Sequence, residues 1–316
     1  MSEMKDPRQI FGEALVEVGE KYSNLIAISA DSSSGSGMTP FREKFPRRHL
    51  EFGIMEQGVI GFASGLATTG KMPFVVAIAP FVTSRPFEMF RNDLGYMKQN
   101  VKVVGRCAGI SYSDLGPTHQ SLEDVAIIRT IPGVTVLNPG DPVEIKRVVH
   151  AAAALNGPCY IKLGKEKMPV LYEDDYPFEL GKGVLVRDGK EVTIIATGSV
   201  FPRAHAATEI LVKDGVDVRL IDIHTLKPFD REVVIKAAEQ TGRIVTVEEH
   251  YLAGGLGSLV AETLARAKKS AGIEMIGIDD QFASNGPYEE LLGLYGLLPD
   301  QIVKTVKEFI TEKVPS

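Results

Sequence analysis

The sequence predicts an α/β protein made of two doubly wound domains with mainly parallel sheets. Short runs rich in valine and isoleucine alternate with amphipathic stretches of helical length along nearly all of the 316 residues. The apolar runs are continuous, as expected of strands that are covered on both faces. The alternation breaks once, over residues 169–189, where two prolines, three glycines and several acidic residues gather. We therefore expect a first domain over residues 1–170, a linker over 171–188 and a second domain over 189–316.

The first helix is predicted to begin at Pro7, because Asp6 is a good N-cap and proline suits the first helical position. The strands expected after it in the first domain are residues 25–29, 74–79, 101–105, 134–137 and 159–162. The helices expected between them are residues 58–69, 87–97, 122–130 and 142–155.

The second domain repeats the alternation of strand and helix. Its expected strands are residues 192–196, 216–221, 244–247 and 273–277. Its expected helices are residues 200–213, 231–240, 257–268 and 299–312.

Composition and charge exclude several classes of protein. A net charge of -6 argues against a nucleic-acid partner, because sequence-independent binding depends on neutralising phosphates. No run reaches the roughly 18 apolar residues of a membrane span, and the N-terminus lacks a signal-peptide core. Cys107 and Cys159 are too few for a disulfide framework and have no metal-ligand spacing. We expect a cytoplasmic protein that binds neither nucleic acid nor membrane.

A carboxylate stands where a strand-like stretch meets a glycine-rich helix, in HLEFGIMEQGVIG (residues 49–61). Glu56 lies near the helix start, where an acid is favoured by the helix dipole whether or not it has a function. The position also follows the carboxyl end of a strand, where open α/β sheets place their ligands. Flanking Ile54 and Met55 would partly desolvate the carboxylate, which would help it to share a proton with a ligand.

Three further segments are expected at the same edge of the sheet. SADSSSGSGMT (residues 29–39) is a flexible loop whose amides and hydroxyls can cradle an anion, or simply a loop. IAPFVTSRPFEMFR (residues 78–91) places Phe81 directly after a strand, as a core residue or as a platform for a flat heterocycle. GISYSDLGPTHQSLED (residues 109–124) places His119 on a loop before a helix that Ser121 and Asp124 would open as a capping box. Singly, these segments indicate only a two-domain α/β protein with a site at the edge of the first sheet.

Together the segments occur in the order of the pyrimidine-binding domain of transketolases. The resemblance rests on the SAD loop, EFGIMEQ, IAPFVTSRPFEMFR, GPTHQSLED and IPGVTVLNPGDPVE. Later segments, VTIIATGS, VRLIDIHTLKPFD, VTVEEHYLAGGLGS and GIDDQFASNG, are similar to the family's C-terminal domain. The EFGIMEQ and GPTHQ segments are specific, whereas the later ones are shared more widely among thiamine enzymes.

The resemblance implies a thiamine-diphosphate enzyme split over two chains. The family's diphosphate-binding domain carries a Gly-Asp-Gly motif, to which Gly140-Asp141-Pro142 is the only close match here. We therefore expect this chain to be the C-terminal subunit, paired with an N-terminal diphosphate-binding subunit in an α2β2 heterotetramer. The partner would bind Mg2+ (or Ca2+), and this chain would supply no metal ligand. The implied reaction, in the pentose phosphate pathway, moves a two-carbon ketol unit from a ketose phosphate to an aldose phosphate.

The resemblance also assigns roles to residues of this chain that bind the cofactor. Glu56 matches the catalytic glutamate that hydrogen-bonds the cofactor's pyrimidine nitrogen. Phe81 matches the aromatic that stacks on the pyrimidine, Ile54 and Ile78 add apolar wall, and Asp31 aligns with an acid near the thiazolium.

Other matched positions face the substrate. His119 matches a catalytic histidine that bonds the donor sugar, and Arg8 aligns with an arginine that grips the phosphate. This sequence departs from the family at three positions: Cys107 replaces a histidine, Leu115 replaces an aspartate and Lys165 replaces an arginine. The loss of two polar contacts weakens the expectation that standard pentose phosphates are the substrates.

There are three alternatives: two enzymes of related architecture and one subunit without catalytic function. The beta subunit of a 2-oxo acid dehydrogenase has the same two domains, but GPTHQ and IDIHTLKPFD are closer to transketolase. Deoxyxylulose phosphate synthase shares the THQ element but normally forms one long chain. A non-catalytic partner-binding subunit would have no need of Glu56, Phe81 and His119 together.

Overall fold

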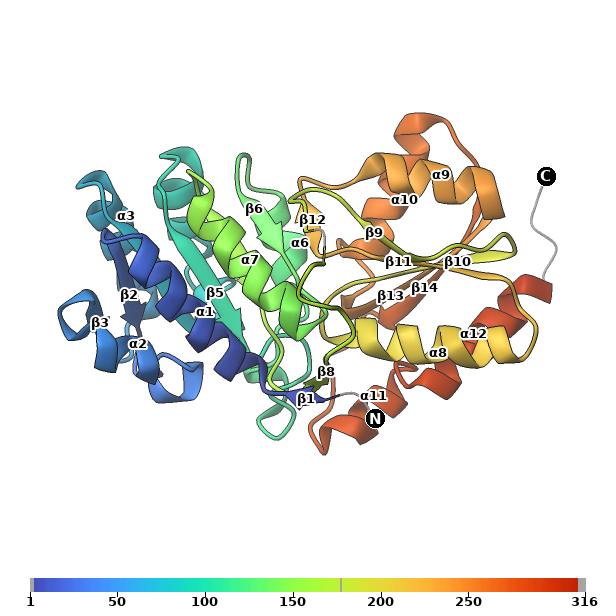
Figure 1. Ribbon diagram of the computed structural model, residues 1–316, viewed down its shortest axis with the longest axis horizontal. Helices are drawn as coiled ribbons and strands as arrows, with labels where there is room; N and C mark the ends of the chain where they lie inside the picture. Colours follow the sequence, from blue (N-terminus) through green and yellow to red (C-terminus); the bar gives the residue numbers. More distant parts are fainter. Residues whose placement is uncertain (1–2, 177, 312–316) are drawn as a thin grey trace.

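The computed structural model of the chain describes residues 3–176 and 178–311. Two α/β domains lie side by side along the long axis, each with a central and mostly parallel sheet (Figure 1). The predicted fold class is confirmed. Within these residues, no helix is both long and apolar enough to cross a membrane.

The first sheet has seven strands in the order β12-β6-β7-β5-β4-β2-β3, and all neighbours are parallel except β12 and β6. Its strands are β2 (Leu25–Ser29), β3 (His49–Glu51), β4 (Met72–Ile78), β5 (Lys102–Arg106), β6 (Thr135–Leu137), β7 (Cys159–Lys162) and β12 (Thr225–Lys227). A separate antiparallel pair joins β1 (Met4–Lys5) to β8 (Met168–Pro169).

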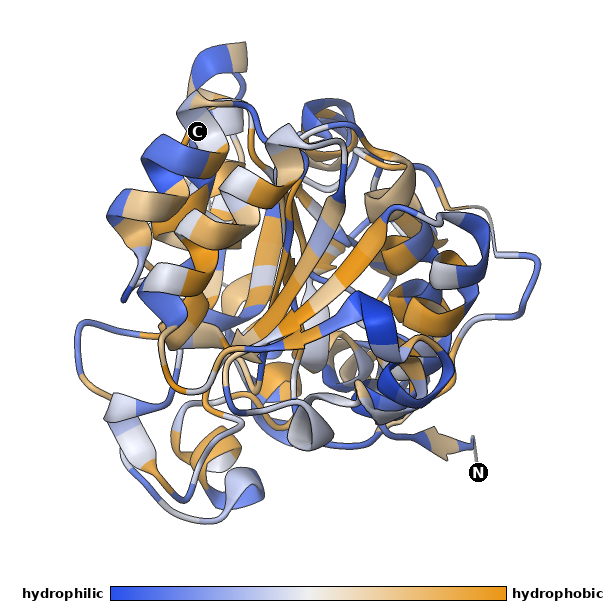
Figure 2. Cartoon of the chain, turned by 90° about the vertical axis from the view of Figure 1, so that its left-hand side faces the viewer, coloured by the Kyte–Doolittle hydropathy of each residue, from blue (hydrophilic) through white to orange (hydrophobic). Residues whose placement is uncertain are grey.

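Helices cover both faces of this sheet. One apolar core contains α1 (Pro7–Lys21), α2 (Thr39–Lys44) and α7 (Pro142–Ala154). Packed on the other face are α3 (Glu56–Thr68), α4 (Ala79–Val82), α5 (Phe87–Met89), the π-helical η3 (Phe90–Tyr96) and α6 (Asp124–Arg129). Seen from the side of this domain, apolar strands lie between helices whose outer faces are polar (Figure 2).

The second sheet has five strands in the order β14-β13-β10-β11-β9, of which only β9 is antiparallel to its neighbour. Its strands are β9 (Val184–Arg187), β10 (Val192–Ala196), β11 (Val218–Asp222), β13 (Arg243–Tyr251) and β14 (Gly272–Ile278). Figure 1 shows α9 (Arg231–Thr241) and α10 (Leu256–Ala267) above this sheet, and α8 (Phe201–Lys213) and α12 (Pro299–Thr311) below it. The short α11 (Tyr288–Leu294) precedes α12.

Several elements differ from the sequence-based expectation. The helix expected over residues 87–97 is α5 followed by the π-helical η3, and the proposed linker contains β9. The segment β12 belongs to the second domain in sequence but pairs with β6 of the first sheet. The helix expected to end at residue 312 is described to Thr311, and residue 312 lies outside the described residues.

The two domains share one apolar core and one buried cluster of acids. The core formed by α3, β4 and α6 continues through Leu226 of β12 into the face of the second sheet under α9 and α10. Where α7 begins, Tyr176 donates a hydrogen bond of 2.5 Å to Glu144, and Tyr172 donates one of 2.7 Å to Asp222 at the end of β11. Because Glu144 and Asp222 come from different domains, this cluster joins them through the connecting segment.

Burial raises the pKa of Glu144 to about 7, although hydrogen bonds from Tyr176 and Gly140 oppose the shift. Burial and the neighbouring charge of Glu144 hold the pKa of Asp222 well above its usual value. The folded chain therefore retains a proton here that the unfolded chain releases.

The stability of the chain should fall as pH rises through this range. With its folded pKa raised, Glu144 contributes stability that is fully present below its ordinary pKa of 4.5 and lost by about pH 7. The loss from this one group is about 3 kcal/mol. Glu144→Gln should flatten the fall in thermal midpoint between pH 5 and pH 7.5, whereas Glu173→Gln on the exposed connector should not. Parallel pH profiles for wild type and Glu144→Gln would contradict this assignment.

Candidate functional site at the carboxyl edge of the first sheet

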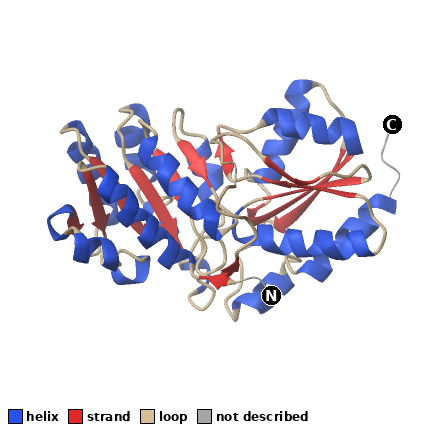
Figure 3. Ribbon diagram, in the orientation of Figure 1, coloured by secondary structure: helices blue, strands red, loops and turns tan. Residues whose placement is uncertain are grey.

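The loops that carry the predicted site residues leave the first sheet at one edge. The parallel strands β2, β4 and β5 run in the same direction, so their carboxyl ends meet there (Figure 3). The serine-rich loop follows β2, α4 follows β4, and the segment of residues 107–121 follows β5.

Glu56 is the first residue of α3, and its carboxylate is buried against Arg85. The residue is 6% exposed, and Arg85 Nη1 donates a hydrogen bond of 2.9 Å to Glu56 Oε2. The neighbouring Ile54, in contrast, is 76% exposed. A buried carboxylate with one exposed cationic partner is therefore available to a ligand that can replace that partner.

The same guanidinium lies on an aromatic ring. The centre of the Arg85 guanidinium is 3.9 Å from the Phe81 ring centroid. The His119 ring meets Phe81 edge-on with centroids 5.1 Å apart, and Tyr112 meets the His119 ring at 5.5 Å. Glu56, Phe81 and His119, which are far apart in sequence, are thus brought together around one planar cation.

A second group of side chains surrounds Cys107. Arg106 Nη1 donates a hydrogen bond of 3.2 Å to the Cys107 sulfur, and Arg8 and Lys165 act on the same thiol electrostatically. Burial nevertheless raises the pKa of Cys107, because the thiol is almost fully enclosed. The side chain of Arg8 is also held by Asp6, with Nη2 2.6 Å from Oδ2. Three cations therefore face one small neutral side chain.

The two groups are joined by a ring and a lysine. Lys165 Nζ lies 5.2 Å from the centroid of Tyr112, and the Tyr112 ring also contacts the His119 ring. Among the described residues, the acid paired with Lys165 is the exposed Asp114, over a long 3.9 Å, so its charge is available to another anion.

The serine-rich loop is held at the edge by strand β3. The backbone amide of Asp31 donates a hydrogen bond of 2.6 Å to Glu51, and the Ser33 hydroxyl lies 3.0 Å from His49 Nε2. Asp31 has a φ of 53°, which lies in the left-handed region. Its side chain is exposed, and Ile78, at the end of β4, is half-buried beside α4.

The second domain supports the His119 segment from beneath. Glu249, near the end of β13, accepts a hydrogen bond of 2.7 Å from the Ile110 amide and one of 2.8 Å from the Tyr288 hydroxyl. Gln120 Nε2 donates a hydrogen bond of 2.8 Å to the Ser284 carbonyl. Both ends of the segment are thus fixed to the second domain.

The capping box expected of Ser121 and Asp124 is wrong. Asp124 is fully buried and accepts hydrogen bonds of 2.7 Å from the Tyr160 hydroxyl and 2.8 Å from Lys162 Nζ, both on β7. Burial alone would raise the pKa of Asp124, but the charge of Lys162 and these hydrogen bonds hold it below its usual value. The carboxylate therefore anchors the start of α6 to the sheet rather than capping the helix.

Sequence reasoning did not single out Arg85, Arg106 or Tyr112. Arg85 lies four residues after Phe81, a spacing that brings side chains together where the backbone is helical, so the signal was present. Arg106 ends β5, next to Cys107, and was overlooked because arginine is common on surfaces. Among the residues that the structure describes, no group of three or more His, Cys, Asp or Glu is arranged to hold a metal ion.

Comparison with known proteins identifies the family. Residues 3–170 match the model of the transketolase pyrimidine binding domain, and residues 181–302 match that of the transketolase C-terminal domain. A putative transketolase C-terminal section from Methanocaldococcus jannaschii is 40% identical over 96% of each chain. One of the subunits of an apulose-4-phosphate transketolase from Phocaeicola vulgatus is 37% identical over 96% of this chain and 97% of its own.

A solved structure described as a split gene transketolase, inactive beta4 tetramer, superimposes with a TM-score of 0.91 at 37% identity. The match covers 98% of this chain and 99% of that one. This chain therefore belongs to the transketolase family, whose members use thiamine diphosphate, and its relatives are subunits of split transketolases.

The buried ion pair below the site is open to a direct test. Asp124→Asn should lower the free energy of unfolding by about 3–5 kcal/mol, because it removes the carboxylate that directly contacts the buried Lys162 ammonium. Adding Lys162→Met to Asp124→Asn should recover part of the loss. Denaturant unfolding measures both variants.

Glu17→Gln is the matched control, since it breaks the exposed pair with Lys146 and should cost under about 1 kcal/mol. A loss of that small size for Asp124→Asn would contradict the structural role assigned to this carboxylate.

Proposed function

We propose that this chain holds the aminopyrimidine of thiamine diphosphate in a two-chain transketolase. The reaction is the transfer of a two-carbon ketol unit from a ketose phosphate to an aldose phosphate. The observation that carries the proposal is the position of Arg85. Its planar N–H-bearing group lies on the Phe81 ring and hydrogen-bonds Glu56 at the same time. A flat heterocycle with a protonated ring nitrogen can meet the same two residues by replacing it.

Thiamine diphosphate, when bound, supplies the electron sink for carbon–carbon bond cleavage. The protein's part is binding, orientation and the control of protons. Glu56 accepts the hydrogen bond from the pyrimidine nitrogen, and its burial keeps water from competing for that bond. Phe81 fixes the plane of the ring, while Ile78 and Ile54 add apolar wall and Asp31 stands near the thiazolium.

His119 is the group on this chain that meets the donor sugar. Its ring makes edge contacts with Phe81 and Tyr112, and its Nδ1 lies 2.9 Å from the Thr118 hydroxyl, so both the ring and its nitrogens are held in place. A histidine so placed can donate a hydrogen bond to, or accept one from, the donor's hydroxyl or carbonyl oxygen. Arg8 and Lys165, the cations beside Cys107, then hold the phosphate of the donor sugar.

The site offers the sugar fewer polar contacts than the family pattern does. Cys107 is nearly neutral and enclosed, and Leu115 is 46% exposed with an apolar side chain. A standard pentose phosphate would find no hydrogen-bond partner at these two positions. A sugar phosphate that lacks a hydroxyl there, or is branched there, would lose fewer hydrogen bonds, so its binding would be weakened less. A relative named for apulose 4-phosphate supports this reading, and the pentose phosphate pathway stays a prediction.

The partner proposed is an N-terminal diphosphate-binding subunit that also binds Mg2+ (or Ca2+). Large apolar side chains are exposed in both domains, with Ile54 of the first domain at 76% and Phe282 of the second at 82%. Such exposure favours burial by another chain. Phe62, on the outer face of α3, is 42% exposed beside Gly65, whose added Cβ would meet open space. This face suits contact with a second copy in an α2β2 assembly. A cytoplasmic location also stays a prediction.

Removing the carboxylate tests the mechanism. In a mixture with a diphosphate-binding subunit, thiamine diphosphate and magnesium, Glu56→Ala should lower two-carbon transfer at least about 100-fold, since proton control is lost. Glu88→Ala is the matched control, because this acid is exposed and its carboxylate accepts a hydrogen bond from Asn92, outside the candidate site. The assay follows transfer from a ketose phosphate to an aldose phosphate. Full activity of Glu56→Ala would overturn the mechanism.

Removing one cation tests substrate recognition. Lys165→Gln should raise KM for the ketose phosphate about tenfold and leave kcat nearly unchanged, because a phosphate contact is present in both ground and transition states. Lys167→Gln, two residues away and exposed, serves as control. An unchanged KM for Lys165→Gln would place the phosphate elsewhere.

A further inference from the structure

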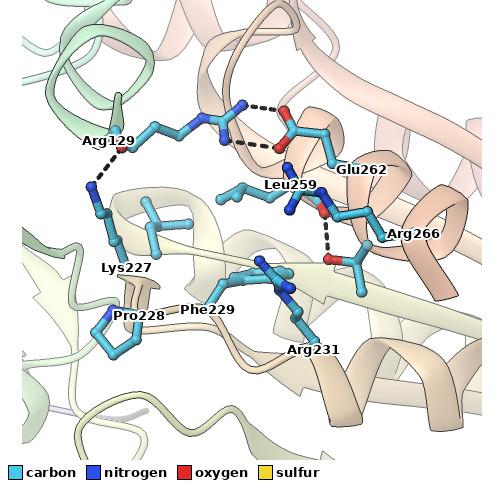
Figure 4. Close-up of a pocket in the computed structure, with 10 residues that line it drawn as sticks. Arg129, Lys227, Pro228, Phe229, Arg231, Leu259, Glu262 and Arg266 are labelled. Carbon is cyan, nitrogen blue, oxygen red and sulfur yellow. Dashed lines mark hydrogen bonds and ion pairs between the residues drawn. The ribbon is translucent and has the colours of Figure 1, made fainter. Parts of the chain in front are cut away.

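A second cavity lies between the two domains, at the opposite edge of the first sheet from Glu56. It has a volume of about 460 Å3 and is lined by the end of α6, the segment after β12, and helices α9 and α10 (Figure 4). Lys227 in its wall pairs with Val136 in β6, close to the point where that strand begins. The parallel strands start at this edge and carry the site already described at the other.

The cavity is strongly cationic. Its lining includes the side chains of Arg129, Lys227, Arg231 and Arg266, against the single carboxylate of Glu262. Arg129 already matches that carboxylate, with Nη2 2.6 Å and Nη1 3.2 Å from its two oxygens. The positive charges of the remaining residues are therefore left without a counter-charge in the cavity wall.

The side chains of Lys227, Arg231 and Arg266 differ in the contacts that hold them in place. Lys227 Nζ donates a hydrogen bond of 2.8 Å to the Arg129 carbonyl and another to that of Ile131, so its position is fixed. Burial and the nearby Arg129 lower the pKa of Lys227, as expected where cations crowd together. An anion in the cavity would relieve this repulsion.

Arg231 and Arg266 have no anchor of this kind. Within residues 3–176 and 178–311, neither side chain makes a hydrogen bond or an ion pair, and both act on Glu262 only electrostatically. Figure 4 shows them reaching from α9 and α10 toward the same space. Two guanidinium groups that converge from separate helices form the arrangement that grips a phosphate.

The floor of the cavity is apolar. Leu226 and Leu259 are buried there, and Phe229 is half-buried beside them. The volume is within the range of sites that take small organic ligands. The cavity thus combines cationic and apolar lining, which suits a molecule with an anionic end and a less polar body.

We propose that this interdomain cavity binds a small organic phosphate, with the phosphate between Arg231 and Arg266 and the organic body over Leu259 and Phe229. The proposal does not depend on the proposed transketolase activity, because none of these residues lies at the carboxyl edge of the first sheet. A nucleotide and a sugar phosphate share this chemistry, and they differ in whether a flat ring is available to lie on Phe229.

Calorimetric titration of the full chain with ADP, ribose 5-phosphate and inorganic phosphate tests the proposal. At least one organic phosphate should bind saturably, and more tightly than inorganic phosphate, because only it uses the apolar floor. The double variant Arg231→Gln/Arg266→Gln should weaken this binding by roughly 100-fold, about tenfold for each charged contact removed. Tighter binding of ADP identifies a flat body, and tighter binding of ribose 5-phosphate identifies a sugar.

The control double variant is Lys190→Gln/Lys236→Gln, which removes the same charge from exposed positions outside the cavity. It should bind as the wild type does, and an unchanged thermal midpoint verifies that both variants fold. The proposal is overturned if neither organic phosphate binds, if inorganic phosphate binds as tightly, or if the arginine double variant binds like the control.

Discussion

The structure depends on the buried contacts between the end of β13 and the segment that carries His119. These contacts are called the joint. Lys162 of β7 donates both to Asp124 and, over 3.2 Å, to the Glu249 carbonyl, so one ammonium joins the sheet, α6 and the second domain. Beside it, the Tyr251 amide donates a hydrogen bond of 2.9 Å to the Leu122 carbonyl. Charges this deeply buried stay in place only when every partner is present. The joint therefore sets where the His119 segment lies relative to Glu56.

The joint also explains why the second domain matters to a site built on the first. Burial lowers the pKa of His250 to about 4, so the ring in this joint is neutral and adds no charge to compete with Lys162. Burial raises the pKa of Glu249, which hydrogen bonds from Ser199 and Tyr288 then oppose. A segment fixed at both ends can present a histidine with little loss of entropy when a ligand binds. The second domain thus positions residues without contributing them.

Much of the fold could be predicted from the sequence because the strands are fully buried. Continuous runs of mainly apolar residues located β2 and β10 to the residue, since both faces of a parallel sheet demand apolar side chains. The strand β12 escaped prediction because three residues pair across the domain boundary, and no local pattern encodes a partner of that kind. The place of Asp124 was misjudged for a related reason: local capping rules compete with a distant lysine, and the buried ion pair prevails.

The candidate site could also be predicted only in part. Glu56, Phe81 and His119 were predicted because each lies in a recognisable segment after a strand, and their roles stay predictions. The structure links them through the contacts of Arg85 with Glu56 and Phe81 and of Phe81 with His119. Arg85, which connects them, was not found because its importance lies in two simultaneous contacts that sequence spacing alone does not specify.

The most direct test of this account is the structure of the chain in complex with a diphosphate-binding partner and thiamine diphosphate. In that complex the pyrimidine ring should lie on Phe81 in the place of the Arg85 guanidinium, with its ring nitrogen hydrogen-bonded to Glu56. A pyrimidine ring bound away from Phe81, or a Glu56 carboxylate still held by Arg85 in the loaded complex, would contradict it.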